Sequence, residues 1–574
     1  MKKYILKYFK GYGKWAIISP ILVLLAVVLR VYIPLLTGQM INDGIMAQNL
    51  EQVVKTGIYM ALAALFAMLC GAGAAYAAAR ASQGFGANLR QHCFSHIQTY
   101  DFSNIDQFSV PSLITRLTSD VDRLTLMAQL TLRMAVRAPF MFITSFLMAL
   151  RINRELSLVF FFAIPLMTFF IIVIGRKAQK LFRKQQNQLD RLNAAVQENL
   201  SGIRIVKSFV REDFEIEKFE LENGRLRDIS LAAMMQIIKL PTAMIAIVST
   251  SIVAVLYFGS KGIVENWLLP GDLFSFLMYI NMVLNSVGMI FLFLINYARA
   301  KASSDRILEI LETESGILEQ PAPLKELADG SIEFKNLSFK YAASAKDNLH
   351  DISFRIESGE TLAIIGSTGS GKSTLVQLLP RLYERSSGEL YLGGAPVEAY
   401  ALEALREQVA IVLQKNTLFS GTIRDNLLWG KADASEEELW TVLRIAQAEE
   451  LVKARPGGLD ALVEQGGANF SGGQKQRLTI ARSLLKKPKI IVFDDSSSAL
   501  DFETDRRLQA ALAKELPEMT KLIIAQRIAT AEQADRILVL DKGEINGLGT
   551  AAELLANNRI YREIAESQAK GVVA

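Results

Sequence analysis

Six long apolar segments, nearly free of charged residues, are crowded into the first 300 residues of this 574-residue chain. A helix needs about 20 mostly apolar residues to cross the hydrocarbon core of a bilayer. Six segments meet this requirement: 15–36, 56–79, 134–150, 156–175, 241–260 and 274–297. One such segment alone is compatible with a buried helix of a soluble protein. Six in one half of the chain indicate an α-helical, six-span membrane domain.

The lysines and arginines between these segments predict the orientation of the domain. The loops after spans two and four are long, and the second carries a dense basic run from Arg176 to Arg191. Basic residues concentrate on the cytoplasmic side of membrane proteins. We therefore expect both long loops and both ends of the chain in the cytoplasm. Arg151 and Arg154, in the short loop after span three, run against this pattern.

The sequences of the two long cytoplasmic loops predict helices. Residues 176–238 contain no proline and only two glycines, and their apolar residues keep a helical spacing. Spans four and five are therefore predicted to continue into the cytoplasm. The chain must reverse at the tip of each hairpin, and we place the tips at 110–114 and 207–211. A rigid hairpin of this kind is suited to carrying force from a soluble domain into the membrane.

After about residue 300 the chain reads as a soluble α/β protein. A proline-containing linker, Gln320-Pro321-Ala322-Pro323, precedes short alternating strands. We therefore divide the chain into a membrane domain at 1–320, a linker at 321–330 and a soluble domain at 331–574.

Composition excludes several classes of protein. With 51% hydrophobic and 21% charged residues, the chain is not a disordered polypeptide. Two cysteines and three histidines exclude a disulfide framework and leave little for a metalloenzyme. A net charge of +5 is small for this length, so we expect no nucleic-acid partner.

The soluble half carries a phosphate-binding loop. It follows the apolar strand 361–365 and opens a helix, and its residues are Gly366, Ser367, Thr368, Gly369, Ser370, Gly371, Lys372, Ser373 and Thr374. This spacing fits the pattern G-x-x-x-x-G-K-[ST] without a mismatch. Glycines let backbone N–H groups turn toward phosphate oxygens, and the helix start adds its positive end. Lys372 supplies charge to the outer phosphates, and Ser373 is a ligand for Mg²⁺.

Two further segments support this interpretation. The strand 489–493 ends in Asp494, and a carboxylate at this place beside a phosphate loop is typical of a residue that holds Mg²⁺. About 105 residues after the loop begins, Ser471, Gly472, Gly473 and Gln474 open another helix. That start is a second candidate anion site, whereas the plain alternative is a capped helix with a flexible entry.

With these motifs the chain resembles the ATP-binding cassette (ABC) transporters, in particular bacterial exporter half-transporters with one six-helix membrane domain and one α/β P-loop nucleotide-binding domain. The resemblance covers essentially the whole chain. It implies ATP and Mg²⁺ as ligands, a place in the bacterial cytoplasmic membrane, and two nucleotide domains facing head to tail. Each ATP then lies between the phosphate loop of one domain and the signature loop of the other.

The resemblance also assigns individual residues. Ser373, Gln414 and Asp494 are expected at Mg²⁺, and Tyr341 is expected to stack on adenine. Ser471-Gly472-Gly473-Gln474 is the signature loop, preceded by Phe470 where the family usually has leucine. The D-loop across the dimer includes Ser498 and Asp501.

Two residues depart from the family pattern where ATP is hydrolysed. Asp495 stands where a glutamate acts as general base, and Gln526 stands where a histidine contacts the γ-phosphate. The aspartate draws its carboxylate back by one C–C bond, and a displacement of about 1 Å costs on the order of 10²-fold in rate. Glutamine donates a hydrogen bond but cannot be protonated. No histidine follows His350 in this chain.

These departures predict a site that binds MgATP and hydrolyses it poorly, beside a signature loop still able to complete a partner's site. The chain then resembles the degenerate-site subunit of a heterodimeric exporter, an ABC-type translocase paired with a different half-transporter chain. We expect export of amphipathic compounds or drugs from a lipid environment. Alternatives are a dedicated peptide, lipid or siderophore transporter, an importer of the same fold, a soluble cassette ATPase, and an ATP sensor without transport.

Candidate cavity residues within the spans are Arg30, Tyr32, Asn281, Asn285 and Asn296.

Overall fold

The computed structural model describes residues 7–342, 344, 346–495 and 500–572. It divides the chain into two compact units: one is Met1–Gln98 with Pro111–Glu312, and the other is Thr99–Val110 with Thr313–Ala574. The segment Thr99–Val110 therefore belongs to the second unit, although the helices on either side of it along the chain belong to the first.

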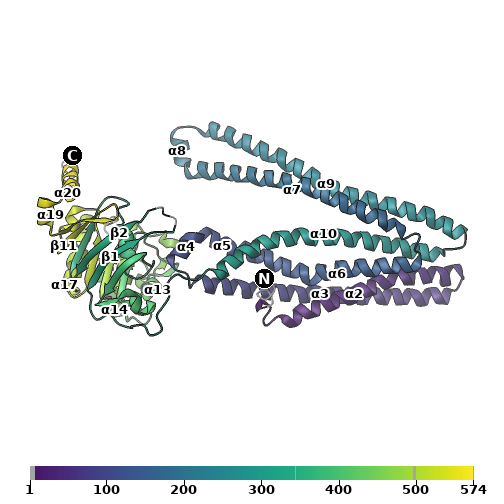
Figure 1. The fold of residues 1–574 in the computed structure, drawn as a ribbon, viewed down its shortest axis with the longest axis horizontal. Coiled ribbons are helices and arrows are strands. Elements are labelled where there is room, and N and C mark those ends of the chain that lie inside the picture. Colours follow the sequence, from purple (N-terminus) through teal and green to yellow (C-terminus); the bar gives the residue numbers. More distant parts are fainter. Residues whose placement is uncertain (1–6, 343, 345, 496–499, 573–574) are drawn as a thin grey trace. The chain divides into compact units, whose positions relative to one another are not determined.

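The first unit consists of long helices (Figure 1). Its helical elements are α2 (Gly13–Gln39), η1 (Met40–Met46), α3 (Leu50–Ile97), α5 (Val110–Thr115), η2 (Arg116–Asp120), α6 (Val121–Ile152), α7 (Leu158–Ser201), α8 (Ile203–Ser208), α9 (Glu212–Val264) and α10 (Pro270–Glu312). Among the described residues, six helical stretches are long and apolar enough to cross a membrane, and each contains one predicted span. Only the span predicted at 156–175 begins two residues before its helix. The six-span prediction is confirmed.

The helices of this unit pack in pairs, α2 with α3, α6 with α10 and α7 with α9. Buried hydrogen bonds join α2 to α10: the Tyr279 hydroxyl donates to the Val31 carbonyl at 2.7 Å, and Ser275 Oγ donates to the Pro34 carbonyl at 2.7 Å. Small residues allow close approach elsewhere, since a Cβ at Gly86 of α3 would collide with Thr125 of α6.

The cytoplasmic extensions follow the prediction in one hairpin and differ in the other. Helices α7 and α9 run side by side far beyond their apolar parts, with α8 at the tip and a break at 209–211 (Figure 1). In the first hairpin the predicted tip at 110–114 is wrong, because those residues form α5. The break lies at 98–109 and contains the short helix α4 (Phe102–Phe108). Pro111 starts a helix here, since a first-turn residue needs no N–H donor.

The second unit is built on a six-stranded sheet with the order β12-β11-β3-β10-β9-β6. All neighbours in it pair in parallel except β11 and β12. Its strands are β3 (Thr361–Ile365), β6 (Val409–Val412), β9 (Ile490–Phe493), β10 (Thr520–Ile524), β11 (Arg536–Asp541) and β12 (Glu544–Gly549). A second, antiparallel sheet has the order β2-β1-β4-β5. It consists of β1 (Ile332–Phe339), β2 (Leu349–Ile356), β4 (Ser387–Leu392) and β5 (Ala395–Pro396), while β7 (Gly421–Thr422) pairs with β8 (Leu462–Val463).

Helices cover the sheets of this unit (Figure 1). They are α11 (Lys372–Gln377), α12 (Leu402–Gln408), α13 (Ile423–Leu428), α14 (Glu436–Ile445), α15 (Glu449–Lys453), α16 (Gly472–Leu484), α17 (Phe502–Glu515), α18 (Ile528–Ala531), α19 (Ala551–Asn557) and α20 (Arg559–Val572). Short 3-10 turns lie at Val397–Ala399, Gly458–Asp460 and Gln465–Gly467.

Both faces of the central sheet are buried. In β3, Leu362 and Ile364 enter one hydrophobic core while Ala363 and Ile365 enter the other. A strand buried on both faces reads as a continuous apolar run, which is how β3 was recognised in the sequence. Since parallel strands end at the same edge of a sheet, the carboxyl ends of β3, β10, β9 and β6 lie in a row, and the candidate site is built there.

Candidate functional site

The phosphate-binding loop connects β3 to α11. Gly369 and Gly371 adopt left-handed backbone angles, φ 82° and 100°, which residues with a Cβ atom rarely adopt. Lys372 Nζ lies across the loop and donates to the Gly366 carbonyl at 2.9 Å and to the Ser367 carbonyl at 2.8 Å. The ammonium group is therefore held at the mouth of the loop, where the outer phosphates of a nucleotide are expected.

The structure brings Ser373 and Asp494, both expected at Mg²⁺, into contact. Ser373 Oγ donates to Asp494 Oδ1 at 2.8 Å. Burial raises the pKa of Asp494, aided by the nearby Asp495, whereas Ser373 and Lys372 oppose this rise. Burial likewise lowers the pKa of Lys372, opposed by the two aspartates. A hydroxyl and a carboxylate oxygen side by side are the hard oxygen donors that Mg²⁺ prefers, so the pair fits that ion.

Asp495 is buried and adopts a left-handed backbone with φ 52°. Its Oδ2 accepts two hydrogen bonds from side-chain amides, one from Gln414 Nε2 at 3.1 Å and one from Gln526 Nε2 at 2.6 Å. Gln414 follows β6, Asp495 follows β9 and Gln526 follows β10, so neighbouring strand ends supply all three groups. The structure thus joins the two departures from the family pattern directly.

An aromatic cluster surrounds Tyr341. The Tyr341 hydroxyl lies 3.1 Å from Thr374 Oγ1 of the phosphate loop, and its ring packs edge-on against Tyr383 at 5.2 Å. Tyr383 in turn packs against Phe102 of α4 and donates its hydroxyl to Asp106 Oδ2 at 2.7 Å. Sequence reasoning missed Tyr383, because no local pattern signals a contact with a segment so far away in the chain.

The C-terminal helix α20 supplies one wall of a cavity of about 550 Å³ beside the phosphate loop. Gln568 of this helix donates to the Gln526 carbonyl at 2.7 Å and accepts from the Ile528 N–H at 2.9 Å. The backbone on both sides of Arg527 is therefore held by a single side chain. Sequence reasoning missed this contact as well.

The signature loop forms the start of α16. Ser471 and Gln474 make a reciprocal capping box, in which Ser471 Oγ accepts from the Gln474 N–H and Gln474 Oε1 accepts from the Ser471 N–H. Phe470 is buried, and the Arg455 guanidinium lies 3.7 Å from the centre of its ring. The unusual phenylalanine is thus accommodated by a cation–π contact.

Asp501 lies near this loop. A cavity of about 440 Å³ is lined by Gly472, Gly473 and Asp501, among others. The Asp501 side chain caps α17 by accepting from the Thr504 N–H at 2.9 Å. Ser498, the other predicted D-loop residue, lies outside the described residues.

The candidate polar residues of the spans fall into two groups. Asn281, Asn285 and Asn296 donate to carbonyl oxygens one turn earlier in their own helix, at 2.8–3.0 Å. Arg30 and Tyr32 line two different cavities, of about 360 Å³ and 870 Å³.

Comparisons with known proteins agree with these features. Family models match the chain over residues 16–287, as the ABC transporter transmembrane region, and over residues 349–498, as an ABC transporter. The uncharacterized ABC transporter ATP-binding protein YfiB of Bacillus subtilis is 38% identical over 563 residues, which is 98% of each chain. The probable multidrug resistance ABC transporter ATP-binding/permease protein YheI of the same organism is 32% identical over 574 residues, covering 98% of this chain and 96% of that protein.

The six membrane-spanning helices and the nucleotide-binding domain are those of an exporter half-transporter. Relatives above 30% identity along nearly the full length share both parts. The chain is a multi-pass membrane protein with an ABC ATPase domain, and it belongs to the ABC transporter family.

Proposed function

We propose that this chain is one subunit of a heterodimeric, ATP-driven exporter that moves amphipathic compounds out across the bacterial cytoplasmic membrane, with both termini in the cytoplasm. In this proposal its own ATP site is degenerate, and ATP is hydrolysed mainly at the site that its signature loop completes on a different half-transporter. The relative named as a multidrug resistance transporter supports the substrate class.

The phosphate loop is proposed to hold the nucleotide. Lys372 exchanges the two loop carbonyls that it contacts for phosphate oxygens, which are stronger acceptors because they are charged. Ser373 and Asp494, with the free amide oxygen of Gln414, would hold Mg²⁺, which neutralises negative charge on the phosphates when bound. The half-buried ring of Tyr341 is proposed to stack on adenine.

The contact between Asp495 and the two glutamine amides carries the proposal of a degenerate site. A general base must lie within about 2.6–3.2 Å of the proton that it removes and must offer a lone pair to it. Asp495 Oδ2 directs its lone pairs at the amides of Gln414 and Gln526. An aspartate is also one methylene shorter than a glutamate. Both effects make Asp495 a poorer base for an attacking water than the glutamate usual in the family.

The signature loop is proposed to be competent for a partner. Ser471 caps α16 and leaves the N–H groups of Gly472 and Gly473 at the helix start, where they are suited to a γ-phosphate of the opposite subunit. Asp501 lies at the same cavity and is proposed to belong to the contact between the two nucleotide domains.

A purified chain in lipid nanodiscs tests this proposal. We expect it to bind a fluorescent ATP analogue in the presence of Mg²⁺ and to hydrolyse ATP at least ~10²-fold more slowly than the pair formed with the half-transporter encoded beside it. In the pair, replacement of the partner's general-base glutamate should abolish turnover, whereas Asp495→Asn in this chain should leave most of it. Brisk hydrolysis by the chain alone would overturn the proposal.

A further inference from the structure

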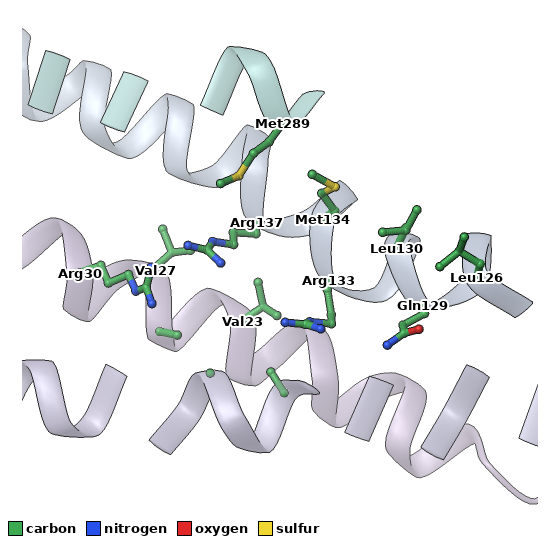
Figure 2. Close-up of a pocket in the computed structure, with 13 residues that line it drawn as sticks. Val23, Val27, Arg30, Leu126, Gln129, Leu130, Arg133, Met134, Arg137 and Met289 are labelled. Atoms are coloured by element: carbon green, nitrogen blue, oxygen red, sulfur yellow. The ribbon is translucent and has the colours of Figure 1, made fainter. Parts of the chain in front are cut away.

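A cavity inside the membrane unit gathers three arginine side chains. It has a volume of about 360 Å³ and lies between α2, α3, α6 and α10. Arg30 comes from α2, and Arg133 and Arg137 come from α6, one helical turn apart. Figure 2 shows Arg137 extending from α6 toward Arg30, with Arg133 entering the same hollow near Val23. None of the described residues that line this cavity is acidic.

Among the described residues of this chain, no acidic side chain pairs with the three guanidinium groups. In the part of the chain that the structure describes, none of them makes an ion pair or a side-chain hydrogen bond. All three side chains enter one cavity, where like charges repel one another. Positive charge inside a membrane is costly, and like charges add to this cost. An anion in the cavity relieves both penalties.

The remainder of the wall, apart from Gln129, is apolar and adaptable. Val23 and Val27 form one side of the hollow, and Met134 and Met289 form another (Figure 2). Methionine side chains adjust to apolar groups of different shape. On α3, Gly71 and Ala74 leave space because they carry little or no side chain. Charge on one part of the wall and apolar surface on the rest match a ligand with an anionic head and an apolar body.

We propose that this cavity is a binding site for anionic amphiphiles, in which Arg30, Arg133 and Arg137 hold a carboxylate, sulfonate or phosphate head group and the valine and methionine wall holds the apolar body. Guanidinium groups bind such oxyanions with paired hydrogen bonds. The inference rests on the proposed function, because it names the class of compound that such an exporter carries.

A second basic hollow lies farther along the same helices. Tyr32 of α2 and Arg151 and Arg154 at the end of α6 line a cavity of about 870 Å³. Arg133 and Arg151 are 18 positions apart, a whole number of turns at 3.6 residues per turn, so both lie on the same face of α6. The two arginines that run against the charge pattern of the loops thus line a second basic hollow at the end of the same helix.

Equilibrium binding of a fluorescent fatty acid tests the site. The probe is dansylaminoundecanoate, the matched uncharged probe is its methyl ester, and the protein is the full chain in nanodiscs of phosphatidylcholine. We expect the acid to bind at least ~10-fold more tightly than the ester. Arg133→Gln and Arg137→Gln should each weaken binding of the acid about tenfold and leave the ester unchanged. Arg137→Lys should retain most of the affinity, and Arg299→Gln, at an exposed position of α10, should change nothing.

Competition identifies the occupant. Laurate should displace the probe, whereas dodecyltrimethylammonium should not. If phosphatidylglycerol in the nanodisc displaces it too, the anionic head is that of a lipid; if only laurate does so, it is that of a free amphiphile. Equal affinity for acid and ester, equal displacement by the cation, or binding unaffected by either glutamine variant would overturn the proposal. ATP-analogue binding shows that each variant is folded.

This experiment uses neither hydrolysis nor a partner. A negative result therefore leaves the degenerate site and the heterodimer in place. Conversely, brisk hydrolysis by the chain alone removes the proposed pairing and leaves the binding result intact.

Discussion

Gln526 Nε2 lies 2.6 Å from Asp495 Oδ2, so the two side chains that depart from the family pattern are hydrogen-bonded to each other. Gln414 Nε2 approaches the same oxygen at 3.1 Å. An amide donor suits a carboxylate that only accepts hydrogen bonds. Asp495 and Gln526, the two residues predicted to depart from the family pattern, therefore form one hydrogen-bonded arrangement.

This arrangement predicts that hydrolysis is restored only when both residues change. Asp495→Glu with Gln526→His should raise the ATPase rate of the purified chain by about 10²-fold or more, the usual contribution of a positioned general base. Each single variant should gain far less, because residues that act as a unit are not additive. Steady-state phosphate release in nanodiscs measures the effect. Adding Lys372→Ala must abolish the gain, and a double variant as slow as the parent chain would contradict the prediction.

The sequence predicted the centre of the site because that part depends on local rules. An apolar strand, a glycine-rich turn and a helix start are read from adjacent residues, and parallel strands bring their carboxyl ends to one edge. Ser373 and Asp494 therefore lie together although 121 positions separate them. The spans were predicted for the same reason, since hydropathy is a property of each segment by itself.

The sequence did not predict the packing of segments that lie far apart in the chain, because no local pattern indicates which segments will contact each other. Tyr383 and Asp106 are 277 positions apart, and no sequence pattern near either residue indicates their hydrogen bond. Arg30 was a candidate cavity residue, but its grouping with Arg133 and Arg137 depends on how α2 and α6 pack. The first hairpin tip was predicted at 110–114, whereas Pro111 lies in the first turn of α5.

The Tyr383–Asp106 hydrogen bond predicts how α4 is held on the nucleotide-binding unit. Tyr383→Phe keeps the aromatic packing and removes only the donor, so we expect α4 amides to exchange with deuterium about tenfold faster, equivalent to ~1–2 kcal/mol. Burial and Asp106 raise the Tyr383 pKa above its ordinary value of 10. Since the fold favours the protonated phenol, wild-type protection should decline as pH rises past 10, whereas the variant should lack this step. Tyr391→Phe, at a partly exposed position of β4 whose hydroxyl donates to Glu389 of the same strand, is the matched control.

Phe470 is predicted to stabilise the entry to the signature helix through its packing under Arg455. Phe470→Ala empties a buried position and should lower the free energy of unfolding by about 3–5 kcal/mol. Phe470→Leu, which restores the residue usual in the family, should cost only about 1 kcal/mol, from the lost cation–π contact and smaller volume. Denaturant unfolding followed by intrinsic fluorescence measures both. Phe502→Leu, at a residue 55% exposed, should be neutral, and equal effects of all three substitutions would contradict the assignment.

Gln568 is predicted to fasten α20 to the backbone around Arg527. Its amide donates to the Gln526 carbonyl at 2.7 Å and its carbonyl accepts from the Ile528 N–H at 2.9 Å. Gln568→Met keeps the length of the side chain and loses both hydrogen bonds, so α20 should lose ~2 kcal/mol of protection against deuterium exchange. Gln568→Glu keeps the acceptor for Ile528 but sets a carboxylate against the Gln526 carbonyl, and should lose at least as much protection. Gln533→Met removes the hydrogen bond that Gln533, in the turn after α18, donates to the Ala529 carbonyl, and should leave α20 unaffected. Unchanged protection of α20 in both Gln568 variants would show that other contacts hold the helix.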